Sequence, residues 1–377
     1  TPSTTVSDIR GRTTQLIEHL GTTTAAPGVT TSYTYDTAGN LATMTDGKGN
    51  RWSYTYDLAG NRLAASDPDK GVTTSTYNAA NQLTSTTDAR GVTLKYFYDN
   101  LGRLIRTTKA DGTTALVSTT YDTVKKGLVS ATTRNLGSGT VTSRIDAYDG
   151  AGRPTSATTV VPAITGLIGT QLAGNYTTTT TYNADGSVKT QTLPAAGGLP
   201  TETLTVGYTP AGLVKTLTGT LGTTTATYVQ DTFYLQWGTV SGLLLGTHSG
   251  KAIQTTYNRD PYTQRLVATN LYRQVAPGVT DERAEISYDP AGNIVQVKAT
   301  EGSGQVDNQC FSYDFQRQLT EAWTPNSATC DVASRSQGSL SGPSPYWTSW
   351  ATGTTGKTTS RTDRTPTTSS TTTYTYP

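Results

Sequence analysis

The sequence repeats a tyrosine-headed motif at a fixed spacing. Tyr35 begins YDTAGNL, and similar strings begin at Tyr56, Tyr77 and Tyr98, so three successive steps are each 21 residues. A constant period of this length is typical of repeat architectures, in which each unit buries its apolar side chains only against its neighbours. The 377 residues are therefore expected to form an array of small units rather than two or three independent domains.

The motif continues beyond Tyr98 with wider spacing. Its later tyrosines are Tyr121, Tyr148, Tyr182, Tyr208, Tyr257, Tyr288 and Tyr313. The gap between Tyr208 and Tyr257 predicts a degenerate unit headed by Tyr228 or by Tyr234. Upstream, the string DIRGR that begins at Asp8 reads as a further unit whose tyrosine has been replaced.

One unit shows how the repeat is expected to fold. Tyr54 and Tyr56 are two apart, so on a strand they face the same side. Asp57 is suited to start a turn through its side chain, and Gly60 allows a backbone that other residues avoid. Residues 62–66 then return as a second strand. The glycines expected to serve such turns are Gly39, Gly60, Gly102, Gly152 and Gly292.

The turn that follows each second strand is also marked. Pairs of Asp and Gly at Asp46 and Asp111 are the strongest short hairpin signal in a sequence. Two strands and two turns per unit predict a continuous antiparallel meander. Because the tyrosine period matches the unit, we interpret these tyrosines as the packed face of the sheet, although tyrosine faces can also stack on sugars.

The composition supports an all-β fold and excludes several other classes. Threonine and tyrosine suit half-buried strands, and glycine and threonine are poor in helix interiors. The net charge of +2 lacks the basic excess with which nucleic-acid binders neutralise phosphates. No run approaches the roughly 20 apolar residues of a membrane helix. With 22 tyrosines, the chain is also too aromatic for a typical disordered protein.

The repeat pattern suggests a division of the chain into two parts. Residues 1–321 are expected to form the repeat sheet, with loop insertions or extended hairpins at about 134–146 and 159–180. Residues 322–377 are rich in Ser, Thr, Gly and Pro, and are expected to be irregular and to lead into a further repeat. We expect the sequence to be a fragment of a longer protein.

The repeated strings resemble the Rhs, or YD-repeat, family of bacterial proteins. The resemblance rests on YDLAGNRL at Tyr56, YDNLGRL at Tyr98, YDGAGRP at Tyr148 and YDPAGNIV at Tyr288, repeated in tandem. The threonine-rich spacing and the segment that begins at Cys310 look like the versions found in secreted actinobacterial proteins. The resemblance implies a long β-sheet wound into a spiral shell, a partial hollow cocoon.

The resemblance also implies a function. Many family members enclose a C-terminal toxin domain inside the shell, while the similar shell of animal teneurins serves adhesion outside the cell. The family's core segment is not found here, because Asp289-Pro290-Ala291-Gly292 runs into Asn293 within an ordinary unit. We therefore expect a structural wall segment, secreted or on the cell surface, whose partner is the rest of its own polypeptide with the enclosed toxin domain. The alternative is an extracellular adhesion or carbohydrate-binding module that contacts other secreted proteins or cell-surface glycans.

Catalysis, metal binding and cofactor binding are not indicated by the sequence. Neither of the two histidines, His19 and His248, lies in a recognisable catalytic motif. An aspartate repeated with every unit is better explained by turn geometry than by catalysis. The string Asp67-Pro68-Asp69 is the nearest approach to a calcium loop, but the required glutamate does not follow.

The C-terminal part contains the residues that leave the repeat. Cys310 and Cys330 are either two free thiols or a disulfide that closes a loop of about 20 residues, and we favour the disulfide, which would imply an oxidising environment. Trp323, Trp347 and Trp350 fall outside the period. They are candidates for a plug, an interface or a glycan contact.

Overall fold

The computed structural model describes residues 3–19, 28–163, 172–248, 251–273, 280–314, 317–333, 335–352 and 357–375. Within them the chain forms 29 strands and one short 3-10 helix, η1 (Gln337–Ser339). The first fourteen strands are β1 (Ser3–Ser7), β2 (Thr13–His19), β3 (Gly28–Tyr35), β4 (Leu41–Thr45), β5 (Arg51–Tyr56), β6 (Arg62–Asp67), β7 (Gly71–Tyr77), β8 (Leu83–Thr87), β9 (Thr93–Tyr98), β10 (Leu104–Lys109), β11 (Ala115–Tyr121), β12 (Val129–Asn135), β13 (Thr140–Tyr148) and β14 (Pro154–Val161). The others are β15 (Gly174–Tyr182), β16 (Val188–Leu193), β17 (Glu202–Tyr208), β18 (Val214–Leu221), β19 (Thr224–Tyr234), β20 (Val240–His248), β21 (Lys251–Arg259), β22 (Leu266–Arg273), β23 (Thr280–Tyr288), β24 (Ile294–Glu301), β25 (Val306–Tyr313), β26 (Leu319–Trp323), β27 (Trp347–Thr352), β28 (Thr358–Arg364) and β29 (Ser369–Thr373).

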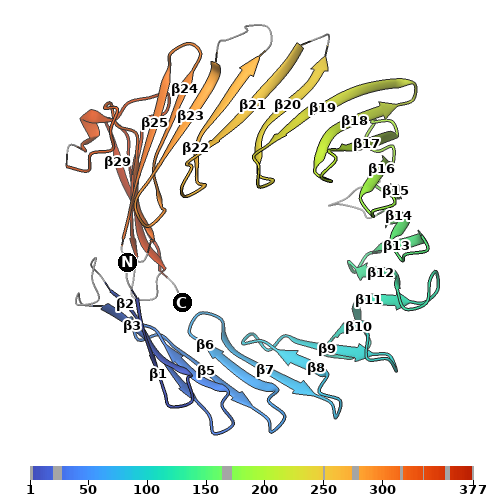
Figure 1. Ribbon diagram of the computed structural model, residues 1–377. Coiled ribbons are helices and arrows are strands. Elements are labelled where there is room, and N and C mark those ends of the chain that lie inside the picture. The colour runs from blue at the N-terminus through green and yellow to red at the C-terminus, as the bar shows by residue number, and fades with distance from the viewer. Residues whose placement is uncertain are drawn as a thin grey trace.

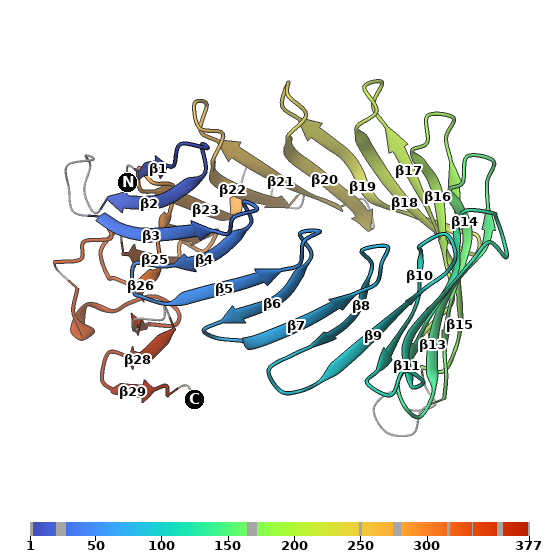
Figure 2. The ribbon, with the colours of Figure 1, turned by 90° about the horizontal axis from the view of Figure 1, so that it is seen from below.

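Every strand pairs antiparallel with the strand that follows it in the chain, from β1–β2 to β28–β29. The predicted meander and the all-β class are thus confirmed. Figure 1 shows this single sheet curling around an open centre until its two ends lie near each other. Seen from the side, the first and last strands lie at different heights, which gives the curl the form of a spiral (Figure 2).

Because successive strands alternate in direction, the connections fall on two opposite edges of the sheet. The connections from odd to even strands carry the tyrosine motif, and we call their edge the tyrosine rim. The connections from even to odd strands, such as residues 68–70 between β6 and β7, form the second rim. The spiral wall is therefore bounded by two rims, and the tyrosine motif lies on one of them.

A bulge marks the place where most of the repeat tyrosines end their strands, Tyr257 within β21 being an exception. In the hairpin of β5 and β6, Thr55 pairs with Ala64 whereas Tyr56 pairs with Arg62, so Leu63 is the extra residue. The same shift precedes Tyr35, Tyr77, Tyr182 and other repeat tyrosines. Bulges of this kind increase the local twist and bend the bulged strand, so a bulge in almost every hairpin bends the sheet in the same sense again and again.

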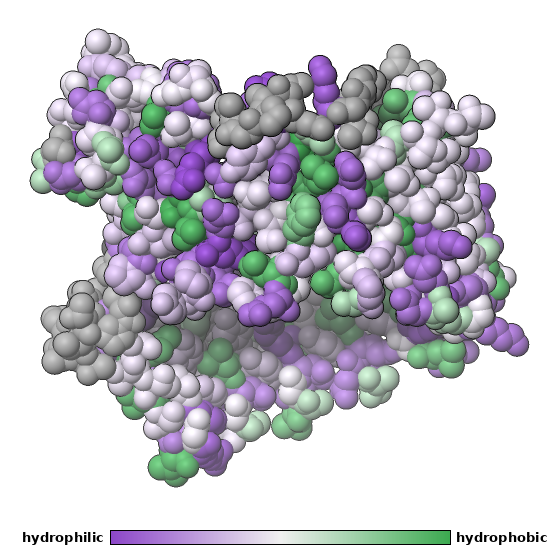
Figure 3. Space-filling model, turned by 45° about the horizontal axis from the view of Figure 1, so that its top comes forward, coloured by the Kyte–Doolittle hydropathy of each residue, from purple (hydrophilic) through white to green (hydrophobic). Residues whose placement is uncertain are grey.

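The wall has almost no conventional core. Among residues 28–109, only Thr108 is buried. Figure 3 shows apolar side chains scattered in small groups among polar ones over the visible face. A single layer of sheet has no second layer to cover it, so most side chains remain half-buried.

Among the described residues, the two segments expected as loop insertions contain more strand than loop, and the segment expected to be irregular contains three whole strands. Most of 134–146 lies in the hairpin of β12 and β13, and 159–180 contains the end of β14 and most of β15, with 164–171 outside the described residues. In the segment 322–377, residues 324–346 leave the sheet, but β27, β28 and β29 then rejoin it. The threonine- and serine-rich strands β28 and β29 are held by pairing with their neighbouring strands.

Candidate functional site

The tyrosine rim is built from one turn used repeatedly. In the unit of Asp57, the carboxylate Oδ1 accepts hydrogen bonds from the backbone N–H groups of Ala59 and Asn61, both at 2.9 Å. The Gly60 N–H donates to the Asp57 carbonyl at 3.1 Å. Gly60 has φ of 85°, in the left-handed region that glycine enters without cost. Gly39, Gly102, Gly152 and Gly292 stand at the same place with φ between 79° and 98°.

The repeated aspartates serve as ionised acceptors in these turns. The Asn61 side chain, followed by the backbone donors, holds the pKa of Asp57 below its ordinary value, and Asn40 does the same for Asp36. The Arg103 guanidinium lowers the pKa of Asp122 to about 2. Carboxylates stabilised in the charged form are poor general acids, which supports a structural role for the repeated aspartate.

The repeat tyrosines join each unit to the one before it. The Tyr98 hydroxyl donates to the carbonyl of Leu83, the first residue of β8, at 2.9 Å. In each case the acceptor is the first residue of the preceding even-numbered strand. The hydroxyls that make this bond are those of Tyr35, Tyr77, Tyr98, Tyr121, Tyr148, Tyr182, Tyr208, Tyr234, Tyr288 and Tyr313. The tyrosines therefore lock neighbouring hairpins together where their backbones stop pairing.

Two of the repeat tyrosines lack this hydrogen bond to the preceding strand among the described residues. Within the described residues, Tyr56 and Tyr257 do not donate in this way, and the Tyr257 hydroxyl instead accepts from Thr255 at 3.4 Å.

Tyr234, not Tyr228, heads the degenerate unit, because Leu235 and Gly238 form the same turn after it. Leucine in place of aspartate hid this unit from the sequence pattern.

An arginine ladder along the tyrosine rim was not foreseen from the sequence. Arg103 bonds Asp99 of its own turn at 2.7 Å and lies 4.2 Å from the ring centre of Tyr121 in the next unit. Arg12, Arg153 and Arg265 stack in the same way on the next tyrosine, at 4.5, 4.4 and 5.4 Å. For Arg12, Arg103 and Arg153 the signal was an arginine four residues after the aspartate, which binds the guanidinium at one end and presents it to the following ring. Arg265 stands five residues after Asp260 and breaks this spacing.

The segment 324–346 leaves the sheet between β26 and β27 and folds back over one face, on the outside of the curl (Figure 1). We call it the strap. Beneath it Cys310, Trp323, Trp347 and Arg364 lie in register on four successive strands. Side chains in one such row share a face of the sheet, so the strap covers a cross-strand row of side chains on this face.

The strap inserts an arginine between two of the tryptophans. The Arg335 guanidinium carbon lies 5.0 Å from the Trp323 ring centre and 4.8 Å from that of Trp347, and its charge pairs with Glu321. Arg364 stacks on Trp347 at 4.1 Å. Trp323 is 1% exposed, so this ring belongs to a local core and not to an open binding surface.

Trp350 is separate from the other two tryptophans. It lines a shallow hollow with Gln318, Leu319, Thr352 and Thr358. The three tryptophans that the sequence grouped together thus divide into two beneath the strap and one beside this hollow.

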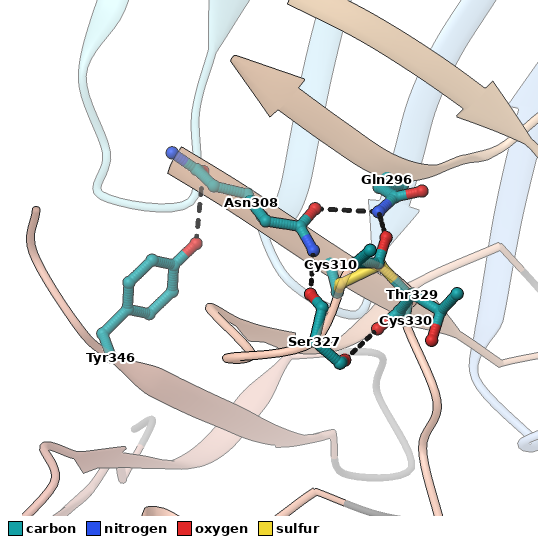
Figure 4. Close-up of a disulfide and its surroundings, with 9 residues drawn as sticks. Gln296, Asn308, Cys310, Ser327, Thr329, Cys330 and Tyr346 are labelled. Carbon is teal, nitrogen blue, oxygen red and sulfur yellow. Dashed lines mark hydrogen bonds between the residues drawn. A yellow bond between two sulfur atoms is a disulfide. The ribbon is translucent and has the colours of Figure 1, made fainter. Parts of the chain in front are cut away.

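A disulfide and two amides fasten the strap (Figure 4). Cys310 of β25 and Cys330 of the strap are bonded, with their Cα atoms 5.4 Å apart, as the sequence favoured. The Gln296 amide donates to the Ala328 carbonyl at 2.9 Å and to Asn308 Oδ1 at 2.8 Å. Asn308 in turn donates to the Ser327 carbonyl at 2.9 Å.

The histidines and the acidic residues do not assemble a reactive centre in the described part of the chain. His19 is 6% exposed at the end of β2, where its Nε2 lies 2.9 Å from the Thr4 hydroxyl. The His248 side chain lies outside the described residues. The described residues contain no group of three His, Cys, Asp or Glu side chains placed to hold a metal ion. Among them, too, no helix has the length and apolarity needed to cross a membrane.

Comparisons with known proteins agree with this geometry. Residues 3–135 match the family described as Teneurin YD-shell. The crystal structure of TcdB2-TccC3 superposes with a TM-score of 0.77 and 20% identity, over 99% of this chain and 20% of that one. The Tc holotoxin pore of Photorhabdus luminescens gives a TM-score of 0.77 and 20% identity, over 99% of this chain and 19% of that one.

The family match and the structural matches cover different parts of the chain. The family match confirms the resemblance to YD-repeat proteins over the first units, and the two structures show the same fold over nearly the whole chain. This chain spans about a fifth of the length of those solved chains. A comparison with curated proteins finds no match.

Proposed function

From its YD-repeat shell fold, we infer that this chain is a wall segment of a container that encloses a domain of the same polypeptide. The observation that carries this proposal is the curl itself. One continuous sheet returns to its own beginning and leaves an open centre (Figures 1 and 2). The role is structural, because the repeated aspartates form hydrogen bonds within the turns and the repeated tyrosines bond each unit to the one before it.

A contact between distant units supports the closure of the curl. The Lys357 ammonium, beside β28 on the tyrosine rim, lies 2.7 Å from the carboxylate of Asp69 on the second rim between β6 and β7. The two residues belong to opposite ends of the sheet. One rim of the late units therefore meets the other rim of the early units, as in a wall whose successive turns lie edge to edge.

The enclosed domain and the extracellular setting are the finer parts of the proposal. The family resemblance supports a toxin or effector as the enclosed domain. The disulfide supports an oxidising environment, since such bonds form and persist in secreted and surface proteins.

Electron microscopy of the full-length natural protein tests the proposal. The expected particle is a hollow shell with density inside it that does not belong to the sheet. Limited proteolysis adds a second readout, because an enclosed domain should be cut far more slowly than the same domain expressed alone. An extended or solid particle, or equal cleavage rates, would overturn the enclosure.

For the alternative adhesive role, the three tryptophans are not equal candidates. Trp323 is buried, and Trp347 is partly buried with Arg335 and Arg364 close to its ring. Trp350, beside its hollow, is therefore the better candidate for a glycan contact.

A further inference from the structure

Exposed apolar side chains gather on the tyrosine rim of the later units. Trp237, in the turn between β19 and β20, is 51% exposed, and Tyr262, in the next turn along the rim, is 92% exposed. Exposed prolines accompany them, with Pro261 in the turn of Tyr262 and Pro210 and Pro290 in the two flanking turns. We call these five residues the ridge. Figure 2 shows the turns between β17 and β22 projecting along the upper edge of the shell.

The turn itself does not need either aromatic ring. Trp237 and Tyr262 each stand two residues after the first residue of their turn, the place that Ala38, Ala59 and Ala291 take in other units. Alanine therefore satisfies the turn, and the two rings add apolar surface that is exposed to water. Tryptophan and tyrosine are the side chains that most often carry the binding energy of a protein interface.

One contact within the chain shows what the tyrosine rim can meet. Lys357 on this rim lies 2.7 Å from Asp69 on the second rim. The ridge lies on the same rim as Lys357, a few turns earlier in the chain. The ridge is thus continuous with an edge that already packs against a second rim.

The second rim has matching chemistry and a matching period. Its turns expose the side chains of Val92, Leu136 and Leu199, and Leu199 is 73% exposed. Neighbouring turns on either rim are two strands apart, which is about 9.5 Å. Because the two rims share this period, several turns of one can engage several turns of the other in succession.

We propose that the ridge binds the second rim of a second copy of this chain. The contact repeats between two molecules the edge-to-edge arrangement of Lys357 and Asp69 within one molecule. Since two different surfaces meet, every stack ends in one free rim of each kind, and the assembly does not close. The copies should therefore form open stacks that lengthen with concentration. This stacking goes beyond the enclosing role and does not depend on an enclosed domain.

Sedimentation velocity of the full chain over a wide range of concentration tests the proposal. The sedimentation coefficient should rise with concentration. The ridge variant, Trp237→Ser with Tyr262→Ser, should associate about tenfold more weakly or worse, because it loses both aromatic anchors. The matched control is Phe233→Ser. Phe233 is 41% exposed on β19 of the same hairpin but lies outside the turn, so its loss should leave association unchanged.

A mixture of two variants tests which surfaces meet. The second-rim variant carries Val92→Ser, Leu136→Ser and Leu199→Ser. Each variant alone should remain monomeric, with the circular dichroism of the sheet retained. The mixture should form dimers and nothing larger, because only one productive contact is left. Dimers of the second-rim variant alone would show that ridge meets ridge, and would overturn the proposal.

The remaining outcomes separate other occupants of the ridge. Sedimentation that does not change with concentration would overturn the second copy as the partner. Flotation of the full chain with phosphatidylcholine vesicles, lost in the ridge variant, would assign the ridge to a lipid surface instead. Equal weakening of association by Phe233→Ser would overturn the ridge as the contact.

Discussion

The regular wall, residues 28–109, and the strap-covered region, residues 294–364, belong to one sheet but are stabilised differently. The wall has a single buried side chain, Thr108. The strap-covered region has a compact core of Cys310, Trp323 and Leu340, with Cys330 and Trp347 against it. Order in the wall comes from polar contacts repeated every 21 residues, whereas order under the strap comes from burial and a covalent bond.

This difference predicts how strongly a substitution should lower the stability of each region. A change in the wall removes one of many equal contacts, and its neighbours remain locked by their own tyrosines and turns. A change under the strap removes a contact that occurs once. Five experiments can break or sharpen this contrast.

Trp323→Ala should have the largest effect. The ring is 1% exposed and carries Arg335, so its loss should cost about 3–5 kcal/mol of local stability. Hydrogen exchange measured by mass spectrometry should quicken in β25 to β28 and stay unchanged in β3 to β10. Equal quickening in both regions would show that the two are not independent.

Removal of the disulfide should come next. Cys310→Ser with Cys330→Ser opens a loop whose ends are 20 residues apart, and should cost about 3 kcal/mol. Proteolysis is expected to begin in the strap and spare the wall. The reduced wild-type protein provides the matched comparison, and strap cleavage that is no faster than in the oxidised protein would contradict the fastening role.

Gly60→Ala tests the wall at its turn. The added Cβ meets open space apart from Asn40 at 3.9 Å, so the expected cost of about 1–2 kcal/mol is that of the left-handed backbone alone. Exchange should rise in the hairpin of β5 and β6 only. Gly338→Ala, where φ is not positive and the space is open, should leave stability unaltered; a similar loss there would show that the cost does not come from the left-handed backbone.

Tyr98→Phe should have a smaller effect. It deletes the hydroxyl that bonds the Leu83 carbonyl at 2.9 Å and keeps the ring, so about 0.5–1.5 kcal/mol is expected. The change should appear as faster exchange between β8 and β9. Tyr257→Phe, which lacks this bond, is the control and should cost less.

Acidification should weaken the wall gradually. The turn hydrogen bonds lower the pKa of Asp57, and Thr114 with its backbone neighbours lowers that of Asp111 to about 2. A lowered pKa in the folded state contributes stability above the unfolded value of 3.8, and that stability is lost as the pH falls toward 2. The melting temperature should therefore fall between about pH 4 and pH 2, and less so in Asp57→Asn. A flat profile would exclude the role of these carboxylates.

The meander could be predicted because each unit is specified by its own residues. Asp57, Gly60 and Tyr56 stand where turn chemistry and strand alternation require them, and no distant contact was needed to place them. The Asp46-Gly47 pair shows the limit of local signals. The pair correctly signals a hairpin bend, but the turn extends from Asp46 to Asn50, and Gly49, not Gly47, takes the positive φ, at 86°.

The strap could not be predicted, because nothing local specifies it. The disulfide was favoured because a covalent link would compensate for a weak local core, yet Arg335 lies among serines with no pattern that points to Trp323 or Trp347. Its place depends on the register that brings those rings side by side on β26 and β27. The bonds from Gln296 and Asn308 to the strap likewise join residues that only the folded chain brings together.

The pairing of every strand with its immediate successor has a consequence for how the protein is made. Most new strands need only a short turn to reach their partners, the strap between β26 and β27 being an exception, so the entropy of chain closure stays small at most steps. Contacts so local favour fast assembly. The sheet can zip up in chain order as the polypeptide emerges from a ribosome or a secretion channel, and each hairpin offers the next one a finished template.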